Sequence, residues 1–369
     1  MPFLSYRQAL ELKKELQETH AEVITPENEN YAEEEASKVV SFATKRYIPF
    51  VVQGGGYSTS GSSSTHGGIV ISLSQMSKIT VDPASRTVAA EGGAKWGDVD
   101  KVAADSGLAV VGCTVNHTSV GGTTLGGVYG WLTGHYSLII DNLLHVRMVL
   151  ADGSIVQASI MENPDLFWAV RGAGQSFGVA TELVFKVYPQ VDPVFGGLLY
   201  FTPDHLPQII EFANGLEERA TGNESFFFDV KFLRELYKDF DKILKTYPGA
   251  GENVVVFELV PYTELIKVPN NATAFANRGK YHNAGSIFCW HDVELDHKMQ
   301  SIQQDLMHKI AQGAGVSRSM ELNQSDMHEV DARELFGENL PRLQKEKMQY
   351  DPNNVFKKQH DIFFHTNRT

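Results

Sequence analysis

Short apolar runs separated by turn residues fill the first half of the chain, and this pattern predicts β-strands. The turn sequence Asp82-Pro83-Ala84-Ser85 lies between two of the runs and predicts a hairpin. Asp152-Gly153 predicts a second hairpin, because this dipeptide favours the tight turns that join antiparallel strands. The predicted strands cover 49–53, 68–74, 78–82, 86–91, 108–111, 142–150, 155–158 and 178–188.

Other segments carry apolar residues at helical spacing among charged residues. The segment 31–46 starts with glutamates and ends with basic residues, as the helix macrodipole favours. Asn163 followed by Pro164 predicts an N-cap and a first helical turn. The predicted helices cover 6–19, 31–46, 96–106, 163–174, 205–219, 295–314 and 334–348.

The pattern changes after residue 191, where aromatic strand-like runs occur at 226–232, 254–260 and 286–293. Two of the predicted helices lie in the same stretch, so it predicts a second lobe in which helices cover an antiparallel sheet. We therefore expect an α+β protein with two lobes, the second of which begins near residue 194.

Composition narrows the class of protein. A length of 369 residues exceeds what one hydrophobic core usually serves, and the net charge of −13 argues against nucleic acid or an anionic membrane as main partner. No apolar run could span a membrane, and the start has no basic stretch followed by an apolar one. Cys113 and Cys289 do not indicate a disulfide framework. We expect a soluble, intracellular protein of the cytoplasm.

Two glycine clusters carry the candidate chemistry. In the first, 53–65, three glycines follow an apolar strand and precede a tail of Ser and Thr. Glycine N–H groups and short hydroxyls suit a pyrophosphate, but a flexible surface loop has the same composition, so this loop alone leaves both interpretations open. The second cluster, 120–131, has too many glycines for a free helix and predicts close backbone packing on something bulky.

Other common sites are not supported by the sequence. A Rossmann fingerprint fails because Thr59 stands where its last glycine is needed, and no Gly-Lys-Ser/Thr occurs for a Walker A loop. The histidines lack metal-ligand spacing, and no Gly-x-Ser-x-Gly is present. The two glycine clusters remain the strongest signal.

The motifs around these clusters resemble a known family. Gly54-Gly55-Gly56-Tyr57-Ser58-x-x-Gly61 and Gly92-Gly93-Ala94-x-Trp96 are similar to the FAD-binding domain of the vanillyl-alcohol-oxidase (PCMH) superfamily. The run 114–131 resembles its berberine-bridge-enzyme-like group, to which 6-hydroxy-D-nicotine-oxidase-like proteins belong. The closing Tyr350-Asp351-Pro352-Asn353-Asn354-Val355-Phe356 also agrees. The resemblance covers most of 48–189 and 334–362 and is loose over 195–320.

This resemblance implies a PCMH-type FAD-binding domain of two subdomains at 1–193, a substrate domain at 194–320, and a berberine-bridge-like element at 321–369 that returns to the FAD domain. It implies that the first cluster cradles the FAD pyrophosphate, that the second passes the ribityl chain and flavin edge, and that 178–179 lie near the adenine. The implied FAD contacts are Gln53, Gly54, Gly55, Gly56, Tyr57, Ser58, Gly61, Val115, Gly121, Gly122, Thr123, Val128, Gly178 and Val179.

Three features depart from that family. Tyr57 stands where relatives carry a histidine bonded to the flavin 8α-methyl. A phenol is a weaker nucleophile than an imidazole at neutral pH because it ionises only at about pH 10, so we expect noncovalent FAD. Val115 stands where bicovalent relatives carry a cysteine, and we interpret Cys113 as a buried small residue. A few tens of residues with strands are missing before the glycine loop, which predicts an open sheet edge.

The resemblance implies an FAD-linked oxidoreductase that oxidises an alcohol, an amine or a secondary metabolite by hydride transfer to flavin N5, with O2 as acceptor. A small-molecule substrate and O2 are then its partners, and no metal is expected. Tyr262, Glu258 and Asn323 are conceivable bases, but the sequence assigns none of them. The alternative is a non-redox flavoprotein, such as a cyclase or a ligand-binding protein, or a variant with weak FAD binding.

Overall fold

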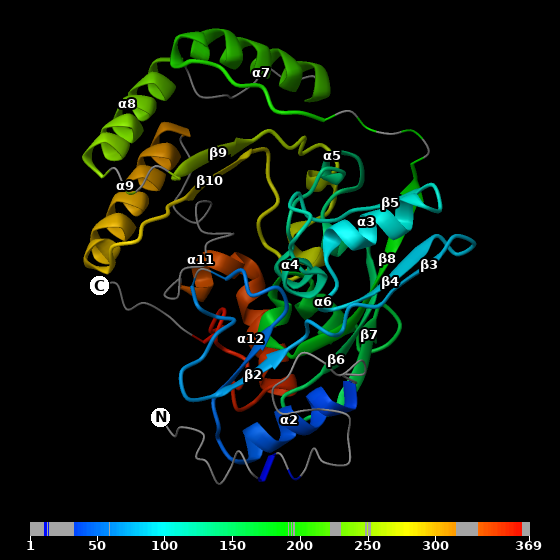
Figure 1. The fold of residues 1–369 in the computed structure, drawn as a ribbon. Helices are drawn as coiled ribbons and strands as arrows, with labels where there is room; N and C mark the ends of the chain where they lie inside the picture. The colour runs from blue at the N-terminus through cyan, green and yellow to red at the C-terminus, as the bar shows by residue number, and fades with distance from the viewer. Residues whose placement is uncertain are drawn as a thin grey trace. The chain divides into compact units, whose positions relative to one another are not determined.

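The computed structural model describes residues 11–12, 14, 33–58, 60–190, 192, 194, 196–221, 230–247, 249, 252–314 and 331–363 (Figure 1). The chain divides into two compact units. Unit 1 comprises 1–193, 268–278 and 326–369, and unit 2 comprises 194–267 and 279–325. The predicted first helix, 6–19, lies outside the described residues except for 11, 12 and 14, which are helical.

The main sheet of unit 1 has six strands, in the order β3-β4-β8-β6-β7 with β5 paired to the end of β8 (Figure 1). Every pair is antiparallel, and both predicted hairpins are confirmed, β3–β4 and β6–β7. The central strand buries every second residue from Val179 to Val187, as a two-residue period requires. The strands are β3 (Ile79–Asp82), β4 (Thr87–Glu91), β5 (Leu108–Val110), β6 (Leu143–Val149), β7 (Ile155–Ser159) and β8 (Val179–Pro189).

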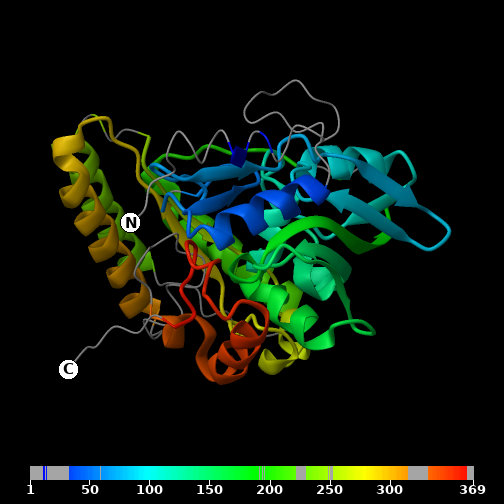
Figure 2. The same ribbon diagram turned by 90° about the horizontal axis from the view of Figure 1, so that it is seen from below.

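A smaller sheet pairs β1 (Phe50–Gln53) and β2 (Ile69–Ser72) in parallel. Helix α2 (Glu33–Lys45) packs against β2, β6 and β7, so it lies beside strands of both sheets (Figure 2). Within the described residues this sheet has only two strands. The core beneath α2 includes Val40, Phe42, Ile71, Val179 and Phe356.

Four further helices of unit 1 are α3 (Trp96–Ala104), α4 (Val120–Gly126), α5 (Thr133–Tyr136) and α6 (Pro164–Ala173). Asn163 is the N-cap of α6 and Pro164 its first residue, as predicted, but the Asn163 side chain makes no capping bond. Asn163 adopts a left-handed backbone (φ 47°), and its amide donates to the Gln157 carbonyl oxygen (2.7 Å) instead of capping the helix.

The carboxyl-terminal part of unit 1 holds α11 (Ala332–Phe336) and α12 (Leu340–Tyr350). The sequence predicts one helix over 334–348, and the structure divides it at Gly337, whose φ of 48° is incompatible with a continuous α-helix. After α12 the chain is irregular and is tied back by Lys347, whose Nζ donates to Asp351 (2.5 Å) and to the Phe356 carbonyl oxygen (2.9 Å).

The described part of unit 2 contains three α-helices, α7 (Leu206–Thr221), α8 (Val230–Thr246) and α9 (Asp296–Ala314). It also contains two antiparallel strands, β9 (Val254–Glu258) and β10 (Asn283–Ile287). The predicted helices at 205–219 and 295–314 and the strand at 254–260 are confirmed. The strand predicted at 286–293 is shifted, since β10 ends at Ile287. The strand predicted at 226–232 is wrong for 230–232, which begin α8, while 226–229 lie outside the described residues.

None of the helices in the described ranges is long and apolar enough to cross a bilayer.

Candidate cofactor site

The first glycine cluster forms the loop that follows β1. Gly56 takes a left-handed backbone conformation (φ 74°), which side chains disfavour. A Cβ added to Gly54 would lie 2.6 Å from the hydroxyl oxygen of Ser119, and one added to Gly55 would lie 2.4 Å from the Tyr57 ring. Glycine therefore suits the turn at position 56, and a side chain at 54 or 55 would require Ser119 or Tyr57 to move.

The turn at 115–119, which leads into the second cluster, lies directly beside this loop. Tyr57 donates a hydrogen bond from its hydroxyl to the His117 carbonyl oxygen (2.9 Å), and the two rings are 5.2 Å apart. Val115, in the same turn as His117, is 42% exposed. The structure thus brings the predicted pyrophosphate loop to the turn directly before the predicted flavin-edge segment, within unit 1.

Helix α4 forms despite its glycines because tertiary contacts hold it. The Gly121 N–H donates to the Gly92 carbonyl oxygen (2.9 Å), and a Cβ added to Gly121 would lie 2.8 Å from that same oxygen. The Thr123 hydroxyl accepts a hydrogen bond from the buried Trp96 indole N–H (2.8 Å). Gly122 differs from its neighbour, since no described atom lies within 4 Å of a Cβ added there.

The remaining predicted residues of the loop and of α4 have ordinary supporting contacts. The Gln53 side chain lies against Gly56, with Nε2 3.1 Å from a Cβ added there. Ser58 hydrogen-bonds to neighbouring serines, and Gly61 has a left-handed φ of 72°. Val128, half-buried, donates from its N–H to the Thr123 carbonyl oxygen (3.4 Å).

Gly178 and Val179 occupy a different environment, at the start of β8. A Cβ added to Gly178 would lie 2.4 Å from the Val149 carbonyl oxygen, so glycine lets two strands approach. The Val179 side chain is fully buried in the core beneath α2. The structure therefore places these two residues in the sheet core, and a contact with adenine would have to come from their backbone.

The sequence did not single out several residues that hold this region together. Ser119 contacts the loop at Gly54, and its place one residue before α4 was the only signal for it. Ser60 and Ser62 lie in the hydroxyl-rich tail but are 8% exposed, so they belong to the interior of the loop. Gln359, which bonds to Ser62, is separated from it by 297 positions, and no local pattern could reveal that contact.

The two cysteines are free thiols. Cys113 is half-buried, so its interpretation as a buried residue is corrected to a partly exposed one. No group of three or more His, Cys, Asp or Glu side chains within the described ranges could hold a metal ion.

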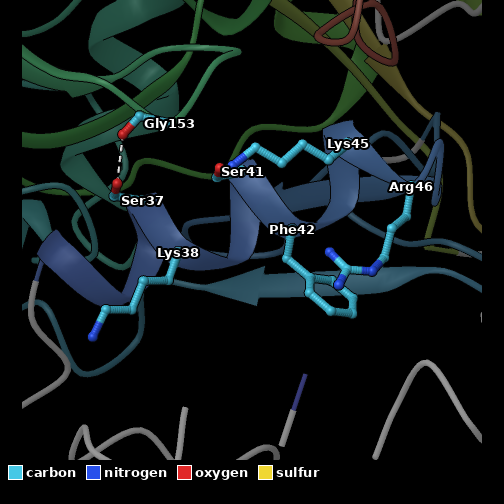
Figure 3. Close-up of a pocket in the computed structure, with 7 residues that line it drawn as sticks. All are labelled: Ser37, Lys38, Ser41, Phe42, Lys45, Arg46 and Gly153. Carbon is cyan, nitrogen blue, oxygen red and sulfur yellow. Dashed lines mark hydrogen bonds between the residues drawn. The ribbon is translucent and has the colours of Figure 1, made fainter. Parts of the chain in front are cut away.

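A cavity of about 430 Å³ lies on the surface of α2, against the turn between β6 and β7 (Figure 3). Arg46 lies over the Phe42 ring (3.9 Å) and pairs with Glu11 (3.7 Å), and Ser37 donates to the Gly153 carbonyl oxygen (2.5 Å). None of the predicted cofactor residues lines this cavity, and we interpret it as the groove between helix and turn. Its lining residues are Ser37, Lys38, Ser41, Phe42, Lys45, Arg46 and Gly153.

The conceivable bases lie in unit 2 or beyond the described residues. Glu258 ends β9, and its Oε2 accepts a hydrogen bond from the Asn283 amide (3.3 Å). Tyr262 follows, with its ring 5.8 Å from the His282 ring. Asn323 lies outside the described residues.

Comparison with known proteins agrees with this architecture. Residues 22–159 match the FAD binding domain family, and residues 322–362 match the family described as berberine and berberine like. The FAD-linked oxidoreductase pgmH of Aspergillus terreus is 29% identical over 425 residues, which cover 88% of this chain and 85% of that protein. The (R)-6-hydroxynicotine oxidase of Paenarthrobacter nicotinovorans is 38% identical over 171 residues, 46% of this chain and 37% of that protein.

Solved structures of similar fold include the 6-hydroxy-D-nicotine oxidase of Arthrobacter nicotinovorans, with a TM-score of 0.66, 24% identity and 90% coverage of both chains. The wild-type BBE-like 1 protein of Physcomitrella patens has a TM-score of 0.75 at 15% identity, again with 90% of both chains covered.

The fold and the matched domains define a flavoprotein with a PCMH-type FAD-binding domain and a berberine-bridge-like carboxyl-terminal element. The chain carries an FAD binding domain and a berberine-like carboxyl-terminal domain, it is similar to FAD-linked oxidoreductases, and it is an enzyme.

The chain is shorter than its relative over the aligned region. The alignment with pgmH runs over 425 positions, whereas 88% of the 369 residues is about 325, so about 100 positions lack a residue of this chain.

Proposed function

We propose that the enzyme is an FAD-dependent oxidase that removes a hydride from an alcohol, an amine or a secondary metabolite and uses O2 as the electron acceptor. The observation that carries this proposal is that the first glycine loop lies beside the start of α4. In α4, Gly122 is exposed with open space beside it, while its neighbours Gly121 and Thr123 are held by tertiary contacts. A backbone-lined surface of this kind suits an anionic cofactor that must approach closely. When bound, FAD supplies flavin N5 as the hydride acceptor.

The chain's own residues fit FAD in defined roles. The loop 54–58 offers backbone N–H groups and the Ser58 hydroxyl to the pyrophosphate, and Gly122 leaves room for the cofactor beside α4. Thr123 is fixed by Trp96, so this part of α4 is held before any ligand arrives. A site prepared in this way loses less entropy on binding.

We propose that the flavin is held without a covalent bond. Tyr57 directs its hydroxyl to the His117 carbonyl oxygen, and a phenol that donates this bond is protonated and poorly nucleophilic. Tyr57 would then serve as a tether between the two glycine segments.

The substrate side of the proposal rests on the sheet of unit 2. Val255 and Phe257 pack into a core with the helices, and side chains alternate between the faces of a strand. Val254 and Val256 therefore lie on the opposite face, where they are 44% and 38% exposed. Glu258 shares that open face, so we propose that this face binds the substrate.

Glu258 is the candidate base on this face. Its carboxylate is half-buried and positioned by the Asn283 amide, and it is the single carboxylate of β9 and β10. With a substrate that bleaches the flavin, Glu258→Gln should slow anaerobic flavin reduction by about 10²–10⁴-fold, the usual loss for a general base. FAD content should stay unchanged, and an unaltered reduction rate would remove Glu258 from this role.

The test of the proposed function is an absorbance spectrum of the purified protein before and after acid precipitation. We expect a flavin spectrum, a yellow supernatant, and peroxide release when substrate and O2 are supplied. A yellow pellet would contradict the noncovalent proposal, and no flavin absorbance after FAD is added would contradict FAD binding.

A non-redox flavoprotein is the second candidate, which the open two-stranded sheet and the roughly 100 missing positions favour. Bound FAD that no compound of the alcohol, amine or metabolite classes reduces under anaerobic conditions would support it over the oxidase.

A further inference from the structure

The carboxyl-terminal segment reaches the cofactor loop through a side chain with no assigned role. The Ser62 hydroxyl is hydrogen-bonded to the Gln359 amide oxygen, across 297 positions of the sequence. The next residue along, His360, accepts a hydrogen bond from the Ser176 hydroxyl through its carbonyl oxygen (2.9 Å). Both ends of the Gln359 contact lie in unit 1.

The segment that carries Gln359 is held firmly by buried groups of its own. Lys347 and Asp351 form a fully buried ion pair, and Asp351 also accepts the backbone N–H groups of Val355 and Phe356 (2.9 Å each). The Phe356 ring packs edge-on against Phe50 of β1, with 5.3 Å between the ring centroids. Gln359 therefore extends from a fixed turn, three residues after its last anchor.

A chain of hydroxyl groups carries this contact into the loop. Ser62 and Ser58 are 2.6 Å apart, and Ser58 and Ser60 are 2.8 Å apart. Each hydroxyl has a single hydrogen to donate. The Ser62 hydroxyl is oriented as the donor toward both Gln359 and Ser58, so these two acceptors share its one hydrogen. The amide of Gln359 thus belongs to the same hydrogen-bond network as Ser58 and Ser60.

This chain fixes the shape of the cofactor loop. The Gly61 N–H donates to the Ser58 carbonyl oxygen (3.3 Å), and Gly61 has a φ of 72°, so the turn between them is tight. The turn directly follows the three glycines. A hydroxyl chain anchored outside the loop keeps the loop's N–H groups in one arrangement before a ligand binds.

We propose that Gln359 is a positioning residue for the cofactor loop. By anchoring Ser62, it holds Ser58 and the adjoining glycine turn in the conformation that binds the pyrophosphate. The proposal rests on the proposed function, since it takes the loop as the FAD pyrophosphate site. It also gives the berberine-bridge-like element a defined task in cofactor binding.

The experiment compares Gln359→Met with Gln344→Ala. Methionine keeps the size of the glutamine side chain but forms no strong hydrogen bond. Gln344 is a matched control, because its amide binds the same segment at the Ile362 carbonyl oxygen (3.2 Å). FAD affinity is measured by flavin fluorescence titration of the apoprotein, and apoprotein stability by thermal unfolding without FAD.

We expect Gln359→Met to weaken FAD binding about tenfold, the effect of losing one partly buried hydrogen bond. The thermal midpoint of the apoprotein should match that of Gln344→Ala, which should bind FAD with wild-type affinity. Wild-type FAD affinity in Gln359→Met would overturn the proposal, and so would a loss of affinity no greater than in Gln344→Ala.

A double-mutant cycle with Ser62→Ala tests the route. Because Gln359 acts through Ser62, the methionine substitution should have little further effect in the Ser62→Ala background. If the losses of FAD affinity in Gln359→Met and Ser62→Ala add up in the double variant, Gln359 does not act through Ser62. If the wild-type protein binds no FAD, both the proposed function and this inference are wrong. If the wild type binds FAD tightly and Gln359→Met binds it equally well, only this inference is wrong.

Discussion

Two adjacent glycines of α4 should respond to alanine in opposite ways. A Cβ added to Gly121 would lie 2.8 Å from the Gly92 carbonyl oxygen and 3.2 Å from its Cα. Ordinary contacts begin at 3.4 Å, so one of two backbones must move by about 0.6 Å. A Cβ added to Gly122 meets no described atom within 4 Å. We therefore expect that the fold requires the first glycine and that the proposed cofactor requires the second.

The magnitudes follow from these contacts. Overpacking costs about 1–3 kcal/mol, and alanine regains up to about 1 kcal/mol of helix propensity, so Gly121→Ala should lower the free energy of unfolding of the apoprotein by about 1–2 kcal/mol. Gly122→Ala should raise it by up to about 1 kcal/mol. The new methyl group occupies cofactor space, so FAD affinity should fall at least about tenfold, which is about 1.4 kcal/mol.

Urea unfolding of the apoproteins and fluorescence titration with FAD measure the two quantities separately. Each variant serves as the other's control, because both add one methyl group to the same helix. If Gly122→Ala binds FAD like the wild type, the space beside Gly122 does not belong to the cofactor. If Gly121→Ala is as stable as the wild type, the contact with Gly92 does not require glycine.

Three further predictions concern other groups of unit 1. Tyr57→Phe removes the hydrogen bond to the His117 carbonyl oxygen and should lower apoprotein stability by less than about 1 kcal/mol, with flavin still released by acid. Tyr57→His should instead form a covalent bond and retain flavin in the acid pellet. Release of all flavin from Tyr57→His by acid would contradict the proposed site. Lys347→Met leaves Asp351 buried without its cation and should cost about 3–5 kcal/mol in urea unfolding, whereas a loss below about 1 kcal/mol would contradict a buried pair. Burial lowers the pKa of His145 below its ordinary 6.5, so the unfolded state is protonated first as the pH falls. The free energy of unfolding should therefore decrease as the pH drops through 6.5. This decrease should be smaller in His145→Gln, and parallel pH profiles of the two proteins would refute the prediction.

Much of the fold followed from local pattern. The Asp82–Ser85 and Asp152–Gly153 turns predicted both hairpins, because turn chemistry and alternating burial act over a few residues. The prediction of a strand over 230–232 was wrong because tertiary packing in unit 2 favours a helix there. Leu233 and Leu236 are buried one helical turn apart in the core of unit 2, and that packing selects a helix over the β preference of the preceding aromatic run.

The candidate site also has features that the sequence predicted and features that only the tertiary structure revealed. The sequence alone determined the two glycine clusters and the closing Tyr350–Phe356 motif, and through them the flavoprotein family, because glycine requirements and motif order are written in consecutive residues. Only the tertiary structure decided which glycine faces the backbone and which faces open space, and only it joined Gln359 to Ser62. Contacts across 297 positions depend on how the whole unit packs, and no local pattern records them.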